Sequence, residues 1–476
     1  MRNEGTTRAL LLLALFAATR IAVWFLSPEE GEVEAVFAPY ALACRRAHAE
    51  GVSVYEWHDR EIARMRTEAL AAGRPPPPEE YRSVEYPPLA IALLWLPGLL
   101  VEDSGGEEGR REFLRSYSRA FRILMLAADL ALLALVWRLA RRLFPGESAR
   151  ECQERVLLYV AGSLALGPFL YDRIDLPLAA LAILSLALLV SRARWIWSFA
   201  ALAVAIHVKI VPIALAPAWI VGAWPVFFKY VERPRRVAPT LRAFASRAGA
   251  LAFLLALLLA PFLFLWGTRS LDFYAFHRDR GLEIESVYAT VLMALSWFGH
   301  AIEVRHGHGS YNLWSPAADG LARASGGIVA ALLVAGSALL VLAVRRRARA
   351  AGSPVSPGAA PSPARLAQAF PAEFALAALF LFTASVAGNK VLSPQFLLWI
   401  LPFACLAPFP RRARLAAWGI LLAALVLTPV VFPLLFWDHL VAGPTVLGAT
   451  VLGIRNVFLV AFLCGLCVAL IRRARS

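Results

Sequence analysis

Stretches of about 20 apolar residues recur along the whole chain, and each is long enough to cross a bilayer core of roughly 30 Å as a helix. Hydrophobic residues make up 59% of the 476 residues and charged residues 17%. Soluble globular proteins have roughly 45–50% and about 25% respectively, and a soluble fold cannot bury the apolar surface of this chain. The sequence therefore indicates a polytopic membrane protein. It excludes a soluble enzyme, a nucleic-acid-binding module and a disordered scaffold.

The apolar intervals predict an all-α polytopic membrane protein with about 12 transmembrane helices. The predicted spans are residues 8–26, 119–137, 156–171, 174–191, 195–208, 209–228, 248–267, 326–344, 371–388, 392–408, 415–436 and 445–471. The first apolar run follows Arg2 and Arg8, as a signal peptide would. It is long and has no clear cleavage site, so we expect a retained first span.

Arginine clusters predict the orientation of these spans. They lie at residues 138–155, 192–194, 229–247, 345–349, 411–414 and 472–475. With the amino terminus inside, all of them fall on one side of the membrane, which the positive-inside rule makes cytoplasmic. The pattern requires that the short apolar pieces Pro87–Val101 and Val287–His300 stay on the outer side without crossing. We therefore expect a multi-pass protein of the inner (plasma) membrane with both termini in the cytoplasm.

This topology divides one transmembrane domain, residues 1–476, into spans and connecting segments. A long first outer loop with interfacial helices is expected at residues 27–118 and a second outer loop at residues 268–325. Residues 350–363, rich in Ala, Gly, Ser and Pro, predict a flexible cytoplasmic linker.

Polar side chains gather at the outer ends of the predicted spans. Ionisable groups at membrane depth are costly, so they usually face an interior cavity and mark function. The site candidates of this kind are Glu32, Glu34, Glu85, Tyr86, Asp172, Arg173, Asp175, Lys209, His277, Arg278, Arg280, Glu285, Asn389, Lys390 and Gln395.

Two kinds of chemistry meet in this set. Glu32 and Glu34 can act as a general base or bind a metal, although no metal site or other cofactor is indicated and a divalent ion stays only an option. The cations Lys209, Arg278, Arg280, Lys390 and Arg173 can hold a phosphate or pyrophosphate. A carboxylate opposite cations is what sugar transfer from a lipid-linked phosphate requires. The chain has no glycine-rich phosphate loop followed by lysine and serine, which argues against an ATP-driven pump.

The chain resembles the integral-membrane glycosyltransferases of the GT-C fold class, and most closely glycosyltransferase family 87, whose members use polyprenyl-phosphate mannose. The matching pieces occur in the expected order over most of the chain, as Glu85–Leu89, Asp172–Asp175, Lys209–Pro212, His277–Ser286 and Asn389–Gln395. Relatives carry an acidic motif just after the first span, often two aspartates separated by one residue, and Glu32-Val33-Glu34 stands there in this chain.

The resemblance implies a polyprenyl-phosphate sugar donor, with mannose as the commonest sugar, inversion at the anomeric carbon, and an acceptor site on the non-cytoplasmic face. The acceptor could be a glycolipid, a glycan or a protein. Membrane lipid is the other expected partner, and no nucleic-acid partner is expected. Within the acidic motif we favour Glu34 narrowly over Glu32 as the base, with Glu85 or Asp175 next.

Two other functions stay open, a transporter or lipid flippase and a non-catalytic assembly subunit. Structural roles are open for the same residues. The acidic loop could be solvated, Lys209 could extend to the lipid interface, and Arg278 with Arg280 could bind headgroups. Asp172, Arg173 and Asp175 could pair with one another, and the aromatic group around Trp437 could anchor the protein at the outer interface.

Overall fold

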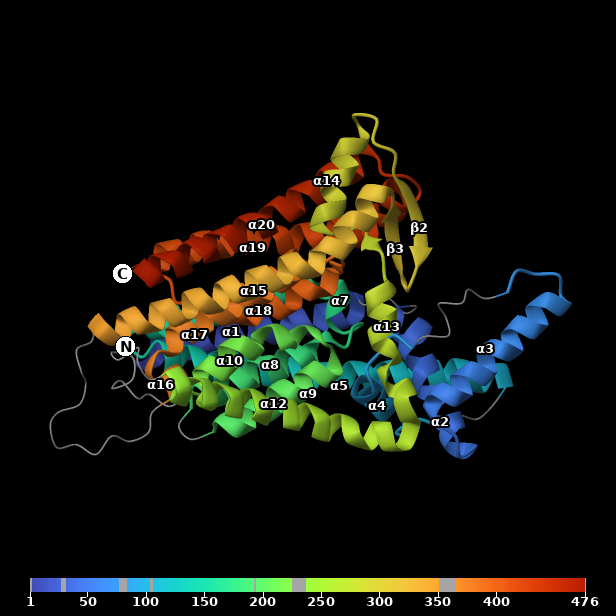
Figure 1. The fold of residues 1–476 in the computed structure, drawn as a ribbon, viewed down its shortest axis with the longest axis horizontal. Coiled ribbons are helices and arrows are strands. Elements are labelled where there is room, and N and C mark those ends of the chain that lie inside the picture. The colour runs from blue at the N-terminus through green and yellow to red at the C-terminus, as the bar shows by residue number, and fades with distance from the viewer. Residues whose placement is uncertain are drawn as a thin grey trace.

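The computed structural model describes residues 2–26, 31–76, 84–102, 106–191, 194–224, 237–350 and 365–475. It is a bundle of helices that run roughly side by side, with both termini at one end (Figure 1). A small sheet and several short helices lie at the opposite end (Figure 1). The all-α class predicted from the sequence is confirmed, apart from this small sheet.

The helices of the first half are α1 (Arg2–Leu26), α2 (Ala38–Ala49), α3 (Val54–Ala71), α4 (Pro88–Gly98), α5 (Gly106–Leu143), α6 (Ala149–Ala165), α7 (Gly167–Leu170), α8 (Asp175–Leu189), α9 (Trp195–Val208) and α10 (Ala216–Gly222). Those of the second half are α12 (Val237–Trp266), α13 (Asp272–Asp279), α14 (Val287–Ser296), α15 (Pro316–Ala350), α16 (Leu366–Ala369), α17 (Pro371–Ala387), α18 (Leu397–Cys405), α19 (Arg411–Pro429) and α20 (Val446–Arg475). Short π-helical or 3-10 turns are η1 (Val33–Phe37), η3 (Val211–Leu215), η4 (Gly267–Leu271), η5 (Pro394–Phe396), η6 (Val430–Leu435) and η7 (Trp437–Val441).

Six helices of the described part are long and apolar enough to cross a membrane. They are Thr7–Phe25, Gly106–Leu143, Arg242–Asp279, Pro316–Arg349, Arg411–Leu435 and Val446–Arg475. Shorter apolar helices, among them α8, α9 and α17, lie between them. Each of the twelve predicted intervals therefore contains a helix, but only six helices have spanning length by themselves.

The two short apolar pieces form helices of 11 residues (α4) and 10 residues (α14). At 1.5 Å per residue each is only about 15 Å long, half the thickness of a bilayer core. The first outer loop was predicted to end at residue 118, but helix α5 already begins at Gly106. The first turns of α5 therefore precede the apolar interval. The predicted linker 350–363 falls almost wholly outside the described residues.

The second predicted outer loop contains the only strands of the described chain. Strands β1 (Leu282–Glu283), β2 (Glu303–Gly307) and β3 (Ser310–Trp314) form an antiparallel sheet in the order β1-β3-β2. Arg305 pairs with Asn312 in its register, and Leu282 with Leu313. The sheet packs with α14, η6, η7 and the start of α20 in a hydrophobic core of its own, separate from the core of the bundle. A compact cap therefore covers this end of the bundle.

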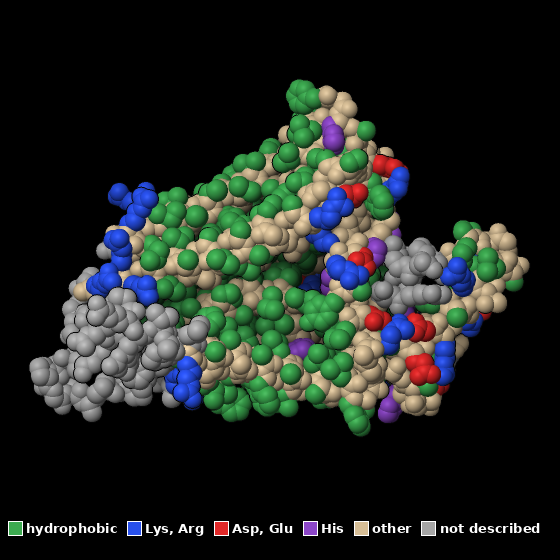
Figure 2. Space-filling view, in the orientation of Figure 1, with side chains coloured by type: hydrophobic (Ala, Val, Ile, Leu, Met, Phe, Trp, Pro, Cys, Tyr) green, Lys and Arg blue, Asp and Glu red, His purple; other side chains and the backbone are tan. Residues whose placement is uncertain are grey.

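Charge is distributed unevenly along the bundle. Hydrophobic side chains cover its flank, and Lys and Arg side chains gather at the end that carries both termini (Figure 2). Acidic, basic and histidine side chains mix at the other end (Figure 2). An apolar flank between two charged ends is what a membrane-embedded bundle presents to lipid and water.

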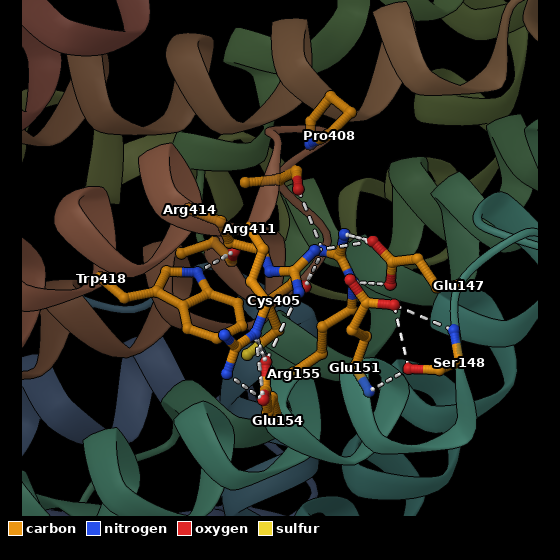
Figure 3. Close-up of polar contacts among 12 residues, drawn as sticks. Glu147, Ser148, Glu151, Glu154, Arg155, Cys405, Pro408, Arg411, Arg414 and Trp418 are labelled. Atoms are coloured by element: carbon orange, nitrogen blue, oxygen red, sulfur yellow. Dashed lines mark hydrogen bonds and ion pairs between the residues drawn. The ribbon is translucent and has the colours of Figure 1, made fainter.

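A buried ion-pair group joins three helices (Figure 3), close to the end of α20 where Arg473 donates to the carbonyl oxygen of Pro408. Glu147, in the turn before α6, accepts hydrogen bonds from Arg155 at 2.6 and 2.7 Å and from Arg414 of α19 at 2.6 Å. Arg155 is fully buried and also donates to the carbonyl oxygens of Cys405, the last residue of α18, and of Ala407 just after it. One carboxylate thus neutralises two buried guanidinium groups and fixes α6, α18 and α19 to one another.

Replacing Glu147 with Gln is expected to destabilise the fold strongly. It leaves Arg155 buried without a carboxylate partner and Arg414 with only Glu154 at 3.7 Å, and breaking a buried pair in this way costs about 3–5 kcal/mol. The thermal midpoint of the purified protein in detergent measures the loss. Glu107→Gln is the matched control, because Glu107 is 95% exposed and 3.9 Å from its partner Arg111. Equal midpoints for the two variants would contradict the structural role of Glu147.

Candidate functional site

A cavity of about 480 Å³ lies at the capped end of the bundle, opposite the arginine-rich end. Its walls come from segments far apart in the sequence: η1, the turn before α4, the turn before α8, the break after α9, the cap sheet and residues 389–399. The cavity-lining residues include Glu32, Glu85, Tyr86, Arg173, Lys209, His277, Arg280, Glu283, Glu285, Asn389, Lys390 and Gln395. Most of the residues singled out from the sequence therefore face one space.

The first wall of the cavity pairs Glu32 with Arg173. The two side chains are in direct contact, and the Tyr86 hydroxyl donates a hydrogen bond of 3.1 Å to the Glu32 carboxylate. Burial lowers the pKa of Arg173 to about 10, so the guanidinium stays charged at neutral pH. Glu34 is not on this wall; its carboxylate accepts instead from the backbone N–H of Gly31 at 3.3 Å. The acidic motif therefore presents Glu32 to the cavity, although we favoured Glu34 from the sequence.

Asp172 holds the start of η1 in place from behind this wall. Its carboxylate accepts from the backbone N–H of Glu32 at 3.0 Å and of Val33 at 3.5 Å. A β-carbon at Gly31 would lie 2.3 Å from the Asp172 carboxylate, so only glycine permits this approach. Burial raises the pKa of Asp172 to about 7, an effect that Glu34 adds to and that the Val33 N–H and Arg122 oppose.

A second ion pair places Lys209 in the cavity. Lys209 follows the last turn of α9 in an extended conformation, and its Nζ donates to Asp175 at 2.8 Å. The indole of Trp399 donates to the same carboxylate oxygen at 2.8 Å, and the other oxygen of Asp175 is buried without a partner in the described part of the chain. Lys209 also lies 5.4 Å from the Trp399 ring centre. Lys209 therefore points inward and does not extend to the lipid interface.

Arg280 is the most buried cation of the cavity, with 8% of its side chain exposed. It donates to the Ser310 hydroxyl at 3.0 Å and to Glu283 at 3.4 Å. Its Nη1 is 3.9 Å from Glu85, beyond hydrogen-bond distance. Burial raises the pKa of Glu85, and Arg280 opposes that rise.

Residues 389–395 join this group through Lys390 and Glu283. The ammonium of Lys390 donates to the carbonyl oxygens of Arg278 and Arg280, and burial lowers its pKa. Glu283 accepts from the backbone N–H of Leu392 at 2.5 Å and from the Ser393 hydroxyl at 3.1 Å. Arg278 itself points away, because its side chain is 76% exposed and paired with Asp279. The structure therefore brings Arg280 and Lys390 together but leaves Arg278 on the surface.

Glu285, on the cavity wall, is held by two residues of α20. Arg455 donates to its carboxylate at 3.3 Å and to its backbone carbonyl at 2.6 Å, and Asn456 donates to the same carbonyl at 3.2 Å. Burial raises the pKa of Glu285 to about 8, and Arg455 opposes that rise. The sequence reading did not single out Arg455 and Asn456.

A buried network anchors the turn that carries Asp172, Arg173 and Asp175. Asp129 of α5 is fully buried and accepts from Arg20 of α1 at 2.8 Å. It also accepts from the hydroxyls of Tyr159 and Tyr171. Arg20 and Asp129 were missed in the sequence, although an ionisable residue inside an apolar span is the signal that points to such a role.

Comparison of the chain with protein-family models, with curated proteins and with solved structures gives no match. Within the described residues, no three His, Cys, Asp or Glu side chains lie close enough to hold a metal ion. The site is therefore interpreted from its own geometry.

Asp172 predicts how stability depends on pH. An aspartate in an unfolded chain has a pKa near 3.9, whereas Asp172 in the folded protein has a pKa of about 7. Between about pH 4 and pH 7 the folded protein therefore holds a proton on Asp172 that the unfolded chain has lost. Stability contributed by this group therefore falls as the pH rises from about 4 to about 7. Asp172→Asn cannot ionise and keeps an oxygen for the Glu32 N–H. We expect its thermal midpoint to exceed that of the wild type at pH 8 and the difference to shrink toward pH 4.

Asp319→Asn serves as the control for this pH profile, because Asp319 is exposed on α15. A constant difference between wild type and Asp172→Asn across the pH range would show that Asp172 does not titrate in the folded protein.

Proposed function

We propose that this protein is a membrane glycosyltransferase that moves a sugar from a polyprenyl-phosphate donor to an acceptor hydroxyl. The observation that carries the proposal is the meeting of Lys209, Arg280, Lys390 and Arg173 with Glu32 and Glu85 in one cavity. Separate parts of the chain supply these cations and carboxylates. The order of these parts is also the order of the motifs that resemble glycosyltransferase family 87, with mannose as the expected sugar.

The proposed reaction is a single displacement with inversion. The acceptor oxygen forms a bond to the anomeric carbon while the bond from that carbon to the phosphate oxygen breaks. A carboxylate takes the hydroxyl proton, and the phosphate leaves with the electron pair of the broken bond. General-base help of this kind contributes about 100- to 10,000-fold in rate, and cations stabilise the charge that grows on the phosphate.

Glu32 is the proposed base, in place of Glu34. It lies on the cavity wall, and Tyr86 and Arg173 fix its orientation. While no donor is bound, the positive charge of Arg173 keeps the Glu32 carboxylate ionised. Glu85 is the second candidate.

Arg280, Lys390 and Lys209 are the proposed phosphate ligands, with Arg173 as a weaker candidate. A guanidinium offers five donors in a planar fork that matches phosphate. Nη2 of Arg280 is 3.4 Å from Glu283, whereas its Nη1 is 3.9 Å from Glu85, beyond hydrogen-bond distance. Lys390 and Lys209 add two ammonium groups that line the same cavity.

The same proposal includes a GT-C type architecture of about 12 spans in the inner membrane. Both termini and the buried group around Glu147 lie at the arginine-rich end, which the positive-inside rule makes cytoplasmic. The cavity then opens on the non-cytoplasmic side, where a lipid-linked donor and an external acceptor can both reach it.

Glu32→Gln is expected to slow sugar transfer by about 100- to 10,000-fold, because glutamine keeps the shape of the side chain and cannot take a proton. Transfer from a radiolabelled polyprenyl-phosphate sugar by purified protein in vesicles measures the rate. Donor binding should persist, since the base acts on the acceptor.

Glu34→Gln is the matched control, two residues away and outside the cavity, and should transfer at close to the wild-type rate. If Glu34→Gln is the inactive variant, the base is the other member of the motif. If both variants are active, Glu85→Gln identifies or excludes the second candidate.

Arg280→Lys is expected to weaken donor binding by about 10- to 100-fold, because it removes charge-assisted bonds worth roughly 1.5–3 kcal/mol each while it keeps the positive charge. Titration with a polyprenyl phosphate, followed by the quenching of tryptophan fluorescence, gives the affinity. Arg278→Lys is the control, because Arg278 is on the surface and paired with Asp279. Equal affinities for both variants would remove Arg280 from the phosphate site.

A further inference from the structure

One wall of the cavity is aromatic and takes no part in the ion pairs described above. Phe432 lies in η6, Trp437 begins η7 and Phe436 stands between the two, while Tyr311 comes from β3. The Tyr311 ring meets Phe436 and Trp437 edge to face, with ring centres 5.9 and 5.6 Å apart. This aromatic wall joins the cap sheet to the end of α19.

The rings of this wall differ in how much of each is buried by packing. Phe436 is 6% exposed and belongs to the core of the cap, against which Tyr311 and Phe432 also pack. Trp437 is 50% exposed, lines the cavity and is not part of that core. A large ring that lines a cavity and stays half-exposed offers apolar surface to a ligand.

The cavity also contains a buried acceptor that protein groups do not satisfy. The Gln395 side chain is 7% exposed and lines the cavity, and its Oε1 has no hydrogen-bond partner in the part of the chain that the structure describes. A buried polar group without a partner is unfavourable, so a ligand that donates a hydrogen bond to it is stabilised there. A hydroxyl group is such a donor.

Aromatic faces combined with hydrogen-bond acceptors suit a pyranose ring. A pyranose has C–H groups on its faces, which match the negative π face of an indole, and hydroxyl groups around its rim. A purely apolar ligand would leave Gln395 unpaired, and a simple phosphate would make no use of the indole. The two observations therefore point to the same class of ligand.

We infer that Trp437 is the stacking platform of a carbohydrate subsite, with Gln395 as a hydroxyl acceptor, and that this subsite holds a pyranose of the acceptor. The inference rests on the proposed function and names the acceptor as a glycan or glycoside. The acceptor is assigned to this subsite because Trp437 is half-exposed, whereas Arg280 and Lys209 are 8% and 18% exposed. The donor sugar must lie next to its phosphate and therefore deeper.

Binding of a simple pyranoside tests the inference without any donor. Full-length protein in lipid nanodiscs is mixed with methyl α-D-mannopyranoside, and saturation-transfer NMR reads the contact of its ring C–H groups with the protein. The wild type and Trp437→Phe should give clear transfer, and Trp437→Ala and Trp437→Leu should lose most of it. Trp314→Ala is the matched control, since Trp314 is 48% exposed at the same end and does not line the cavity.

Transfer kinetics with the same pyranoside as acceptor give the second readout. Trp437→Ala should raise the acceptor KM by about 3- to 10-fold with the donor KM unchanged. A rise in the donor KM alone would overturn the assignment to the acceptor. Full activity and binding in Trp437→Leu would show that the ring only anchors the protein at the interface and would overturn the stacking role. If the pyranoside makes no contact with the wild-type protein, the subsite is wrong. Sugar transfer from the lipid-linked donor tests the proposed function separately.

Discussion

An ionised side chain inside an apolar bundle is tolerated only where it has a partner. The turn between α7 and α8 provides partners to several such groups, each on a different element. Tyr171 donates into the buried Asp129 group. Asp172 caps η1, Arg173 pairs across the cavity wall, and Asp175 holds Lys209. A displacement of this turn would leave at least three charges unpaired. The cavity therefore depends on the buried anchor beneath it as much as on the residues that line it.

The opposite wall is built on the same principle with other elements. Glu283 ends β1 and Glu285 lies in the turn after it, and these residues bind residues 392–393 and α20 respectively. Arg455 reaches this turn from within an apolar helix and is 1% exposed. The segment before η5 and helix α20, both distant in sequence, thus hold this part of the cap in place. Two short turns face one cavity, each fixed by a charge buried in the bundle.

The sequence was sufficient to predict the class of protein and most of the polar residues that line the cavity. It could not choose between Glu32 and Glu34, because that choice depends on the wide helical turn of η1 and on its capping by Asp172. It also could not show that Arg280 faces the cavity and Arg278 the surface, because α13 ends at Asp279, between the two residues. Spacing along a chain gives no information on which of two near neighbours faces inward when the turn between them is irregular.

Arg173, Arg280 and Lys209 are each paired with a carboxylate, and this pairing has a consequence for the proposed reaction. An anionic ligand does not meet bare positive charge; it competes with Glu32 for Arg173 and with Glu283 for Arg280. Net affinity is then a difference between two sets of ion pairs, which permits release of the phosphate after transfer. A phosphate that takes over Arg173 also frees the Glu32 carboxylate from its partner and makes it a stronger base. In this arrangement donor binding would itself prepare the base, so that acceptor activation follows donor binding and does not precede it.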